Sequence, residues 1–171
     1  KPNNHTRVID ATSRYVIPGL IDCHVHLREP GLEYKETIET GSRAAAVGGY
    51  TTLICEPNTL PPIDSLEMVA SFMERVNQKG VVNIYTKACI TKGLLGEELT
   101  DIAKLATDKR VRALSDDGNP VFYESLMKRA CELAAQNKLI ISPHCEDSQI
   151  SLDKAKTNTN VAHFPGKSFC H

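Results

Sequence analysis

The chain has no tryptophan, and aromatic residues make up only 5% of its 171 residues. It also lacks an excess of charge, because 20 lysines and arginines are balanced by 21 aspartates and glutamates. This balance argues against a nucleic-acid-binding surface or an acidic tail. No apolar run is long enough to cross a bilayer, and the polar first residues do not resemble a signal peptide. We therefore expect a cytoplasmic protein with neither a nucleic acid nor a membrane as partner.

The six cysteines show no Cys-x-x-Cys spacing, so they resemble neither a structural zinc site nor a compact disulfide framework. We predict that most of them are buried thiols in a reducing compartment. Cys23 and Cys145 each stand next to a histidine. Because neighbouring strand residues face opposite sides, we assign both cysteines to packing rather than to metal binding.

The most informative segment, residues 18–31, is an apolar run that ends in a His-x-His pair followed by an arginine. Because side chains alternate along a strand, His24 and His26 point to the same face, and Arg28 follows them if the chain stays extended. Two neutral imidazoles can occupy adjacent positions on zinc or a neighbouring first-row metal. A bare His-x-His pair fits a solvated strand face equally well, but residues 16–21 are too apolar for an exposed edge. This context favours a metal site.

Strand-like and helix-like segments alternate along the chain. Apolar or β-branched runs predict five strands, at residues 16–24, 51–56, 82–89, 111–115 and 139–143. Apolar residues at three- and four-residue spacing predict helices between them, at residues 35–47, 65–78, 97–107 and 123–136. This alternation predicts an α/β fold with a parallel sheet covered by helices. We predict a partial TIM (β/α)8 barrel of about four βα units plus a fifth strand, because a complete barrel needs about 250 residues.

Ordered motifs accompany this alternation. The His-x-His segment resembles the metal-binding signature of the amidohydrolase superfamily, and its continuation through Arg28 resembles the bacterial-type dihydroorotase branch. The resemblance continues through residues 35–41, 48–52, 56–59, 115–118 and 144–147. Both ends of the sequence look cut. We expect three regions: a remnant of a small β segment at residues 1–15, a partial amidohydrolase barrel at 16–150, and a polar, weakly structured tail at 151–171.

The resemblance also implies a set of metal ligands. Catalytic groups of such barrels lie at the carboxyl ends of the strands. The family pattern assigns metal binding to Asp117, in an Asp-Asp-Gly turn, and to His144, after the fifth strand. Taken alone, the first would be a solvated turn and the second a core or capping histidine. Together with the His-x-His pair, the resemblance implies that one or two zinc ions are held by His24, His26, Asp117 and His144.

Arg28 and Asn58 are the candidates for substrate binding. A guanidinium matches a carboxylate bidentately and an amide adds a directional hydrogen bond, and the resemblance implies that these positions hold the substrate carboxylate. Alone, Arg28 would be a surface ion pair and Asn58 a turn residue. The chain departs from the family's usual Met-Pro-Asn by having Glu56 before Pro57. We expect this extra negative charge to face away from the site or to be paired.

The function that the resemblance implies is that of a metal-dependent cyclic amidohydrolase, which interconverts N-carbamoyl-L-aspartate and dihydroorotate in pyrimidine biosynthesis. The family's proton-shuttling aspartate belongs to the eighth strand, so we leave the general base unassigned and expect little activity from these 171 residues alone. One alternative is an allantoinase- or hydantoinase-like cyclic amidase, and another is a non-catalytic partner protein. Because half a barrel leaves an open sheet edge, we expect oligomerisation or association with another chain.

Overall fold

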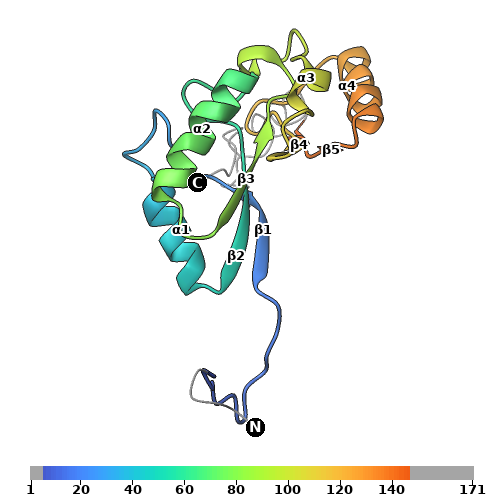
Figure 1. Cartoon of the computed structure of the whole chain (residues 1–171). Coiled ribbons are helices and arrows are strands. Elements are labelled where there is room, and N and C mark those ends of the chain that lie inside the picture. Colours follow the sequence, from blue (N-terminus) through green and yellow to red (C-terminus); the bar gives the residue numbers. More distant parts are fainter. Residues whose placement is uncertain (1–5, 147–171) are drawn as a thin grey trace, which may run out of the picture.

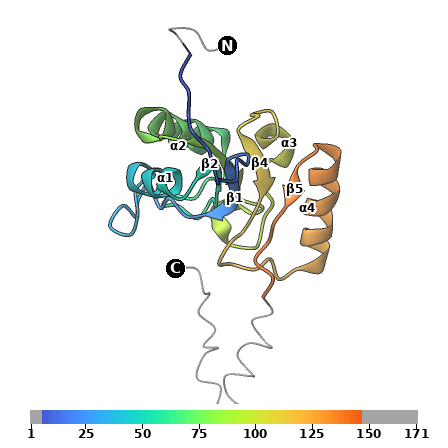
Figure 2. The same cartoon turned by 90° about the horizontal axis from the view of Figure 1, so that it is seen from below.

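Strands and helices alternate in the computed structural model, which describes residues 6–146. Five strands form one parallel sheet in chain order: β1 (Leu20–Val25), β2 (Tyr50–Cys55), β3 (Asn83–Ala88), β4 (Val111–Leu114) and β5 (Ile140–Ile141). The connections contain α1 (Ile38–Val47), α2 (Leu66–Lys79), a 3-10 turn η1 (Lys92–Leu94), α3 (Ile102–Leu105) and α4 (Glu124–Gln136). The sheet curls, and the helices lie around its outside (Figures 1 and 2). This half-barrel confirms the predicted fold class.

Local sequence signals explain where the longer helices begin. The Thr37 side chain accepts a hydrogen bond from the backbone N–H of Thr40 and so caps α1. Ser65 caps α2 in the same way through the backbone N–H of Met68. Such caps satisfy N–H groups that have no partner inside the helix. The face that α2 buries against the sheet follows three- and four-residue spacing and contains Val69, Phe72, Met73 and Val76.

The predicted helix at residues 97–107 is wrong over its first half, because only the single turn of α3 is helical. Before that turn, Leu99 forms an antiparallel bridge with Thr91. The Thr100 hydroxyl donates a hydrogen bond to the Cys89 carbonyl at 2.8 Å. These bonds hold the segment in an extended conformation, and such competition between side chains and helical backbone is invisible in apolar spacing.

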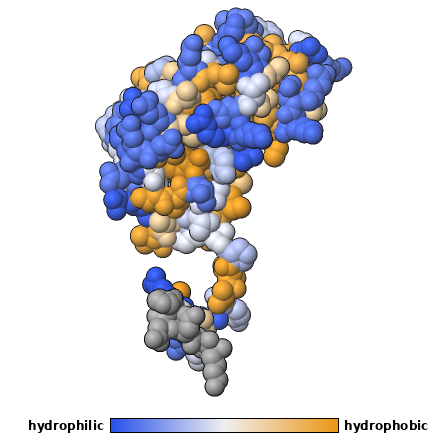
Figure 3. Space-filling model, in the orientation of Figure 1, coloured by the Kyte–Doolittle hydropathy of each residue, from blue (hydrophilic) through white to orange (hydrophobic). Residues whose placement is uncertain are grey.

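The expectation that residues 16–21 are too apolar for an exposed edge is also wrong. β1 is an edge strand, and Val16 is 83%, Ile17 66% and Ile21 61% exposed. An apolar surface is visible in this part of the molecule (Figure 3). Ile140, on the opposite edge strand β5, is 68% exposed as well. Both open edges of the half-barrel therefore carry apolar side chains, so apolar character alone does not argue for metal binding by β1.

The cysteine prediction holds only in part. Among the described cysteines, Cys55 and Cys89 are buried thiols, and desolvation by this burial raises the pKa of both. The remaining described cysteines, Cys23, Cys131 and Cys145, are exposed. The assignment of Cys23 and Cys145 to packing is therefore wrong.

The ends of the described segment add little to the architecture. Residues 6–15 contain no strand. The predicted boundary at residue 150 and the polar tail at 151–171 lie outside the described residues. Within residues 6–146, no helix combines the length and the apolar character that a membrane span requires.

Candidate metal centre

The candidate ligands come from three strands and meet at the carboxyl-terminal end of the sheet. His24 lies within β1 and His26 directly follows it, while Asp117 follows β4 and His144 follows β5. Backbone hydrogen bonds pin neighbouring strand ends together. The Ser115 N–H donates to the Ala88 carbonyl at 2.9 Å. Because all five strands are parallel, their carboxyl ends lie at the same end of the sheet, and this brings residues far apart in sequence together.

Three imidazole nitrogens surround the carboxylate of Asp117, whose side chain is only 3% exposed. Nε2 of His24 lies 3.7 Å from Oδ1, and Nε2 of His26 lies 3.5 Å from Oδ2. Nδ1 of His144 lies 3.7 Å from Oδ1. In the group His24, His26 and Asp117, one ligand atom from each residue lies within 4.8 Å of the others. His144 lies outside this group but contacts the same carboxylate, so the structure places the three predicted histidines around Asp117. Imidazole and carboxylate groups suit zinc and similar divalent metals.

The second nitrogen of each imidazole faces a side-chain oxygen. Nδ1 of His24 lies 3.2 Å from Oε1 of Glu56, and Nδ1 of His26 lies 3.0 Å from Oδ1 of Asn58. Nε2 of His144 lies 2.8 Å from Oε2 of Glu146.

This pairing determines which nitrogen of each ring is available to a metal. An oxygen that accepts from one ring N–H leaves the other nitrogen with a free lone pair. In all three histidines that other nitrogen faces Asp117. Outer oxygen partners of this kind orient the histidines of metal sites and fix their tautomers. The arrangement therefore fits a divalent cation at Asp117.

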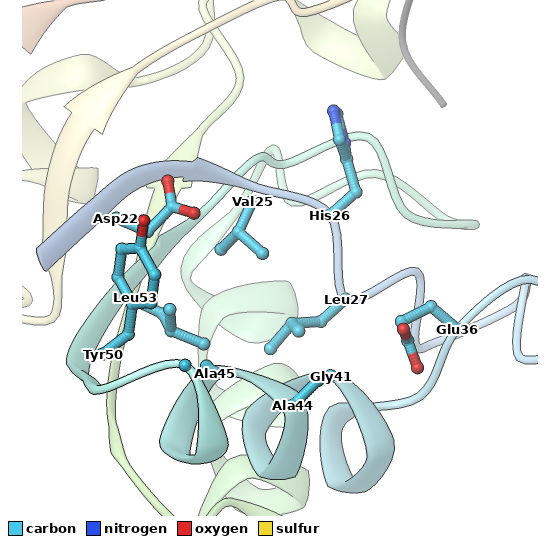
Figure 4. A pocket seen from close by; sticks show the side chains of 11 residues that line it. Asp22, Val25, His26, Leu27, Glu36, Gly41, Ala44, Ala45, Tyr50 and Leu53 are labelled. Carbon is cyan, nitrogen blue, oxygen red and sulfur yellow. The ribbon is translucent and has the colours of Figure 1, made fainter. Parts of the chain in front are cut away.

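Electrostatics around His26 favour its neutral form. Burial, together with the nearby charge of Arg28, lowers the pKa of His26 below its ordinary value. A neutral imidazole is the form that binds metal. His26 is also one of the residues around an apolar hollow between β1 and α1, together with Val25, Leu27 and Leu53, but its ring points away from these apolar side chains (Figure 4).

Asp116 is buried beside the centre and holds two loops together. Its carboxylate accepts hydrogen bonds from the backbone N–H of Ile90 at 2.7 Å and of Thr91 at 3.2 Å. It also accepts from the Thr91 hydroxyl. Burial raises the pKa of Asp116. These contacts tie the segment after β3 to the turn that carries Asp117.

Glu56 is paired, which is one of the two outcomes expected for this departure from the family pattern. Its buried carboxylate forms an ion pair with Lys87 of β3, which is also buried. Sequence reasoning missed Lys87. The signal was available, because a lysine inside a strand predicted to be buried needs a partner. Sequence reasoning also did not identify Glu146, within the motif at residues 144–147, as the oxygen partner of His144.

The two predicted substrate residues have different surroundings. Arg28 does not continue the strand, because β1 ends at Val25 and Arg28 has a φ of 57°. It is half-buried, and among residues 6–146 no hydrogen bond or ion pair engages its guanidinium. Asn58 is engaged: its amide nitrogen donates to Oδ2 of Asp117 at 3.0 Å while its oxygen faces His26. Substrate binding by either residue stays a prediction.

Comparison with known proteins shows the family to which this chain belongs. The profile of dihydro-orotase-like proteins matches residues 13–170. The chain belongs to the dihydroorotase-like family. A dihydroorotase of Thermoanaerobacter sp. (strain X514) is 50% identical over 145 residues, which cover 84% of this chain and 33% of that protein. A dihydroorotase of Aquifex aeolicus (strain VF5) is 45% identical over 144 residues, again 84% of this chain and 34% of the relative. The chain thus spans about a third of the length of these family members.

Solved structures agree with the family at the level of the fold. L-hydantoinase from Arthrobacter aurescens has a TM-score of 0.76 at 22% identity, with 91% of this chain and 35% of that chain covered. Dihydroorotase from Saccharomyces cerevisiae, in complex with 5-fluoroorotic acid, has a TM-score of 0.61 at 19% identity, with coverages of 77% and 37%. These similarities confirm the fold, and the half-barrel matches about a third of each of those longer chains.

Proposed function

We propose that this chain supplies metal-binding residues of a cyclic amidohydrolase of the dihydroorotase type. The observation that carries the proposal is the arrangement of three imidazole nitrogens around one buried carboxylate, at His24, His26, His144 and Asp117. Each ring has a side-chain oxygen on its far side, as metal-binding histidines commonly do. We propose zinc as the metal, bound as one or two ions, because imidazole and carboxylate ligands suit it.

The residues have distinct roles in the proposed chemistry. When bound, a divalent metal supplies the Lewis acidity that activates water and polarises an amide carbonyl. The carboxylate of Asp117 contacts all three histidines and offers two oxygens, so it can bridge two cations. Its burial keeps bulk water away from its negative charge and strengthens its attraction for a cation.

The proposed substrates are N-carbamoyl-L-aspartate and dihydroorotate, interconverted in pyrimidine biosynthesis. Support comes from the relatives named dihydroorotase and from the unengaged guanidinium of Arg28 near His26, which suits an acidic ligand. We propose Arg28 and Asn58 as the groups that bind the substrate carboxylate. For Asn58 this requires the amide to exchange its contact with Asp117 for one with the substrate.

We further propose that these 171 residues hydrolyse little or no substrate by themselves. No carboxylate among the described residues is assigned to proton transfer at the ring nitrogen. The exposed apolar side chains on both sheet edges, including Ile21 and Ile140, support association of this half-barrel with further protein. We also propose a cytoplasmic location, which the free thiols of the described cysteines favour.

The test is to measure zinc by plasma mass spectrometry and dihydroorotate hydrolysis on the purified chain. We expect bound zinc without measurable turnover, and loss of the zinc in His24→Ala. The matched control is His163→Ala, which removes a histidine to which we assign no metal role. Unchanged zinc content in His24→Ala would refute the metal centre. Turnover by the chain alone would refute the proposed inactivity, and faster hydrolysis of a hydantoin than of dihydroorotate would favour a hydantoinase-like enzyme instead.

A further inference from the structure

Glu56 combines a charge with almost complete burial. Its side chain is 0% exposed, and that of its partner Lys87 is 3% exposed. Lys87 also donates a hydrogen bond to the Ser142 hydroxyl at 2.9 Å. Desolvating two charges costs so much that apolar residues of similar size are often as stable or more stable in their place. Stability alone is therefore a weak reason for an ion pair at this position.

The Glu56 carboxylate has a second contact, and that contact points to the metal centre. The oxygen that binds Lys87, Oε1, also lies 3.2 Å from Nδ1 of His24. The other oxygen, Oε2, is buried without a hydrogen-bond partner among the described residues. The carboxylate is thus turned so that a single oxygen serves both the lysine and the histidine.

His24 needs such a partner more than the other two candidate histidines do. Its side chain is 52% exposed, whereas those of His26 and His144 are 10% and 18% exposed. Packing therefore restrains the His24 ring least, and free rotation of an exposed ring costs entropy when a metal fixes it. A hydrogen bond from Nδ1–H to Glu56 would fix both the ring and its tautomer.

We propose that Glu56 is a positioning residue for His24, and that Lys87 holds Glu56 in place and neutralises its charge. This inference rests on the metal centre proposed above and deepens it. The acceptor at position 56 keeps the proton of His24 on Nδ1, so that Nε2 faces Asp117 with its lone pair. The positive charge of Lys87 lets an acidic residue orient the histidine without adding net negative charge beside a site for an acidic substrate.

Two double variants isolate the acceptor from the buried charge. Glu56→Gln/Lys87→Met removes both charges and keeps a side-chain oxygen at position 56 that no lysine competes for. Glu56→Met/Lys87→Met also removes both charges but leaves no acceptor. Neither variant buries an unpaired charge, so both are expected to fold. Thermal unfolding of the metal-free proteins, followed by circular dichroism, checks this directly.

The readouts are the His24 tautomer, from long-range 1H–15N correlation spectra of the metal-free chain, and the zinc dissociation constant, from chelator competition. We expect the Gln/Met variant to keep His24 protonated on Nδ1 and to bind zinc within a few-fold of the unsubstituted chain. We expect the Met/Met variant to lose that tautomer preference and to bind zinc about 10- to 100-fold more weakly, the usual cost of losing an outer partner of a metal-binding histidine.

Equal tautomers and equal zinc affinities in the two variants would overturn the proposal. So would weakened zinc binding in the Gln/Met variant equal to that in the Met/Met variant, because the acceptor would then have no effect. If the unsubstituted chain bound no zinc while the tautomer still depended on the acceptor, the metal centre would fail and the positioning of His24 would stand.

Discussion

Replacing Asn58 with Asp tests how well the candidate centre tolerates a second carboxylate beside Asp117. In the structure the Asn58 amide nitrogen donates to Oδ2 of Asp117 at 3.0 Å and to its backbone carbonyl at 3.3 Å. Its oxygen lies 3.0 Å from Nδ1 of His26. An aspartate has nearly the same shape and keeps the oxygen that faces His26. It replaces the donor that faces Asp117 with a second carboxylate oxygen.

The expected cost follows from this geometry. Two unit negative charges 3.0 Å apart repel by about 5.5 kcal/mol at an effective dielectric constant of about 20. Loss of a hydrogen bond to a charged group adds about 1.5–3 kcal/mol. Rotation of the new side chain or uptake of a proton relieves part of both. We therefore expect Asn58→Asp to lower the free energy of unfolding of the metal-free chain by about 3–5 kcal/mol.

The assay is urea unfolding followed by far-ultraviolet circular dichroism, with chelator and then with saturating zinc. The control, Asn58→Ala, loses the same hydrogen bonds without adding charge, so we expect a cost of about 1–3 kcal/mol in the metal-free chain. A bound cation offsets repulsion between carboxylates. Zinc should therefore reduce the loss in the free energy of unfolding caused by Asn58→Asp more than the loss caused by Asn58→Ala. Metal-free Asn58→Asp as stable as the unsubstituted chain would refute this reasoning.

Three further predictions concern the surrounding fold. Iodoacetamide at pH 8 should leave Cys55 and Cys89 unlabelled in the native chain, because burial removes access and raises the pKa of both thiols; peptide mass spectrometry that found them labelled like the exposed cysteines would contradict this. Phe72→Ala should cost about 3–5 kcal/mol in urea unfolding, because Phe72 is 1% exposed in the core, and a cost under about 1 kcal/mol would place it outside the core. The hydrogen bond from Arg110 lowers the pKa of Asp108 below 3.8. The contribution of ionised Asp108 to the free energy of unfolding is therefore complete well above pH 3.8 and is lost as the pH falls through the lowered pKa. Asp108→Asn should therefore lower the free energy of unfolding at pH 7 and lower it by less at pH 3. A loss of stability that was equal at both pH values would rule out the ion pair as its cause.

Some of the fold could be predicted because its signals are local. The face of α2 at three- and four-residue spacing and the caps at Thr37 and Ser65 depend on residues within one or two helical turns. The segment before α3 could not be predicted in this way, since the Thr100 hydroxyl binds the carbonyl of Cys89 across a loop. The argument from apolar residues failed at β1 for a related reason: apolar character does not reveal which strand lies at an edge.

The order of residues along the chain was enough to predict that imidazoles and a carboxylate lie at or near the carboxyl ends of separate parallel strands. Parallel strands carry such residues to the same end of the sheet whatever the side-chain details. The partners of those groups emerge only from contacts in the folded chain, most of them between residues far apart in sequence. The oxygens of Glu56, Asn58 and Glu146 each face one histidine, and Lys87 reaches Glu56 from the neighbouring strand. Arg28 does not continue the extended strand of His24 and His26, because its backbone has a positive φ. These contacts depend on strand register, side-chain direction and burial across residues far apart in the chain, and none of these properties is encoded by spacing alone.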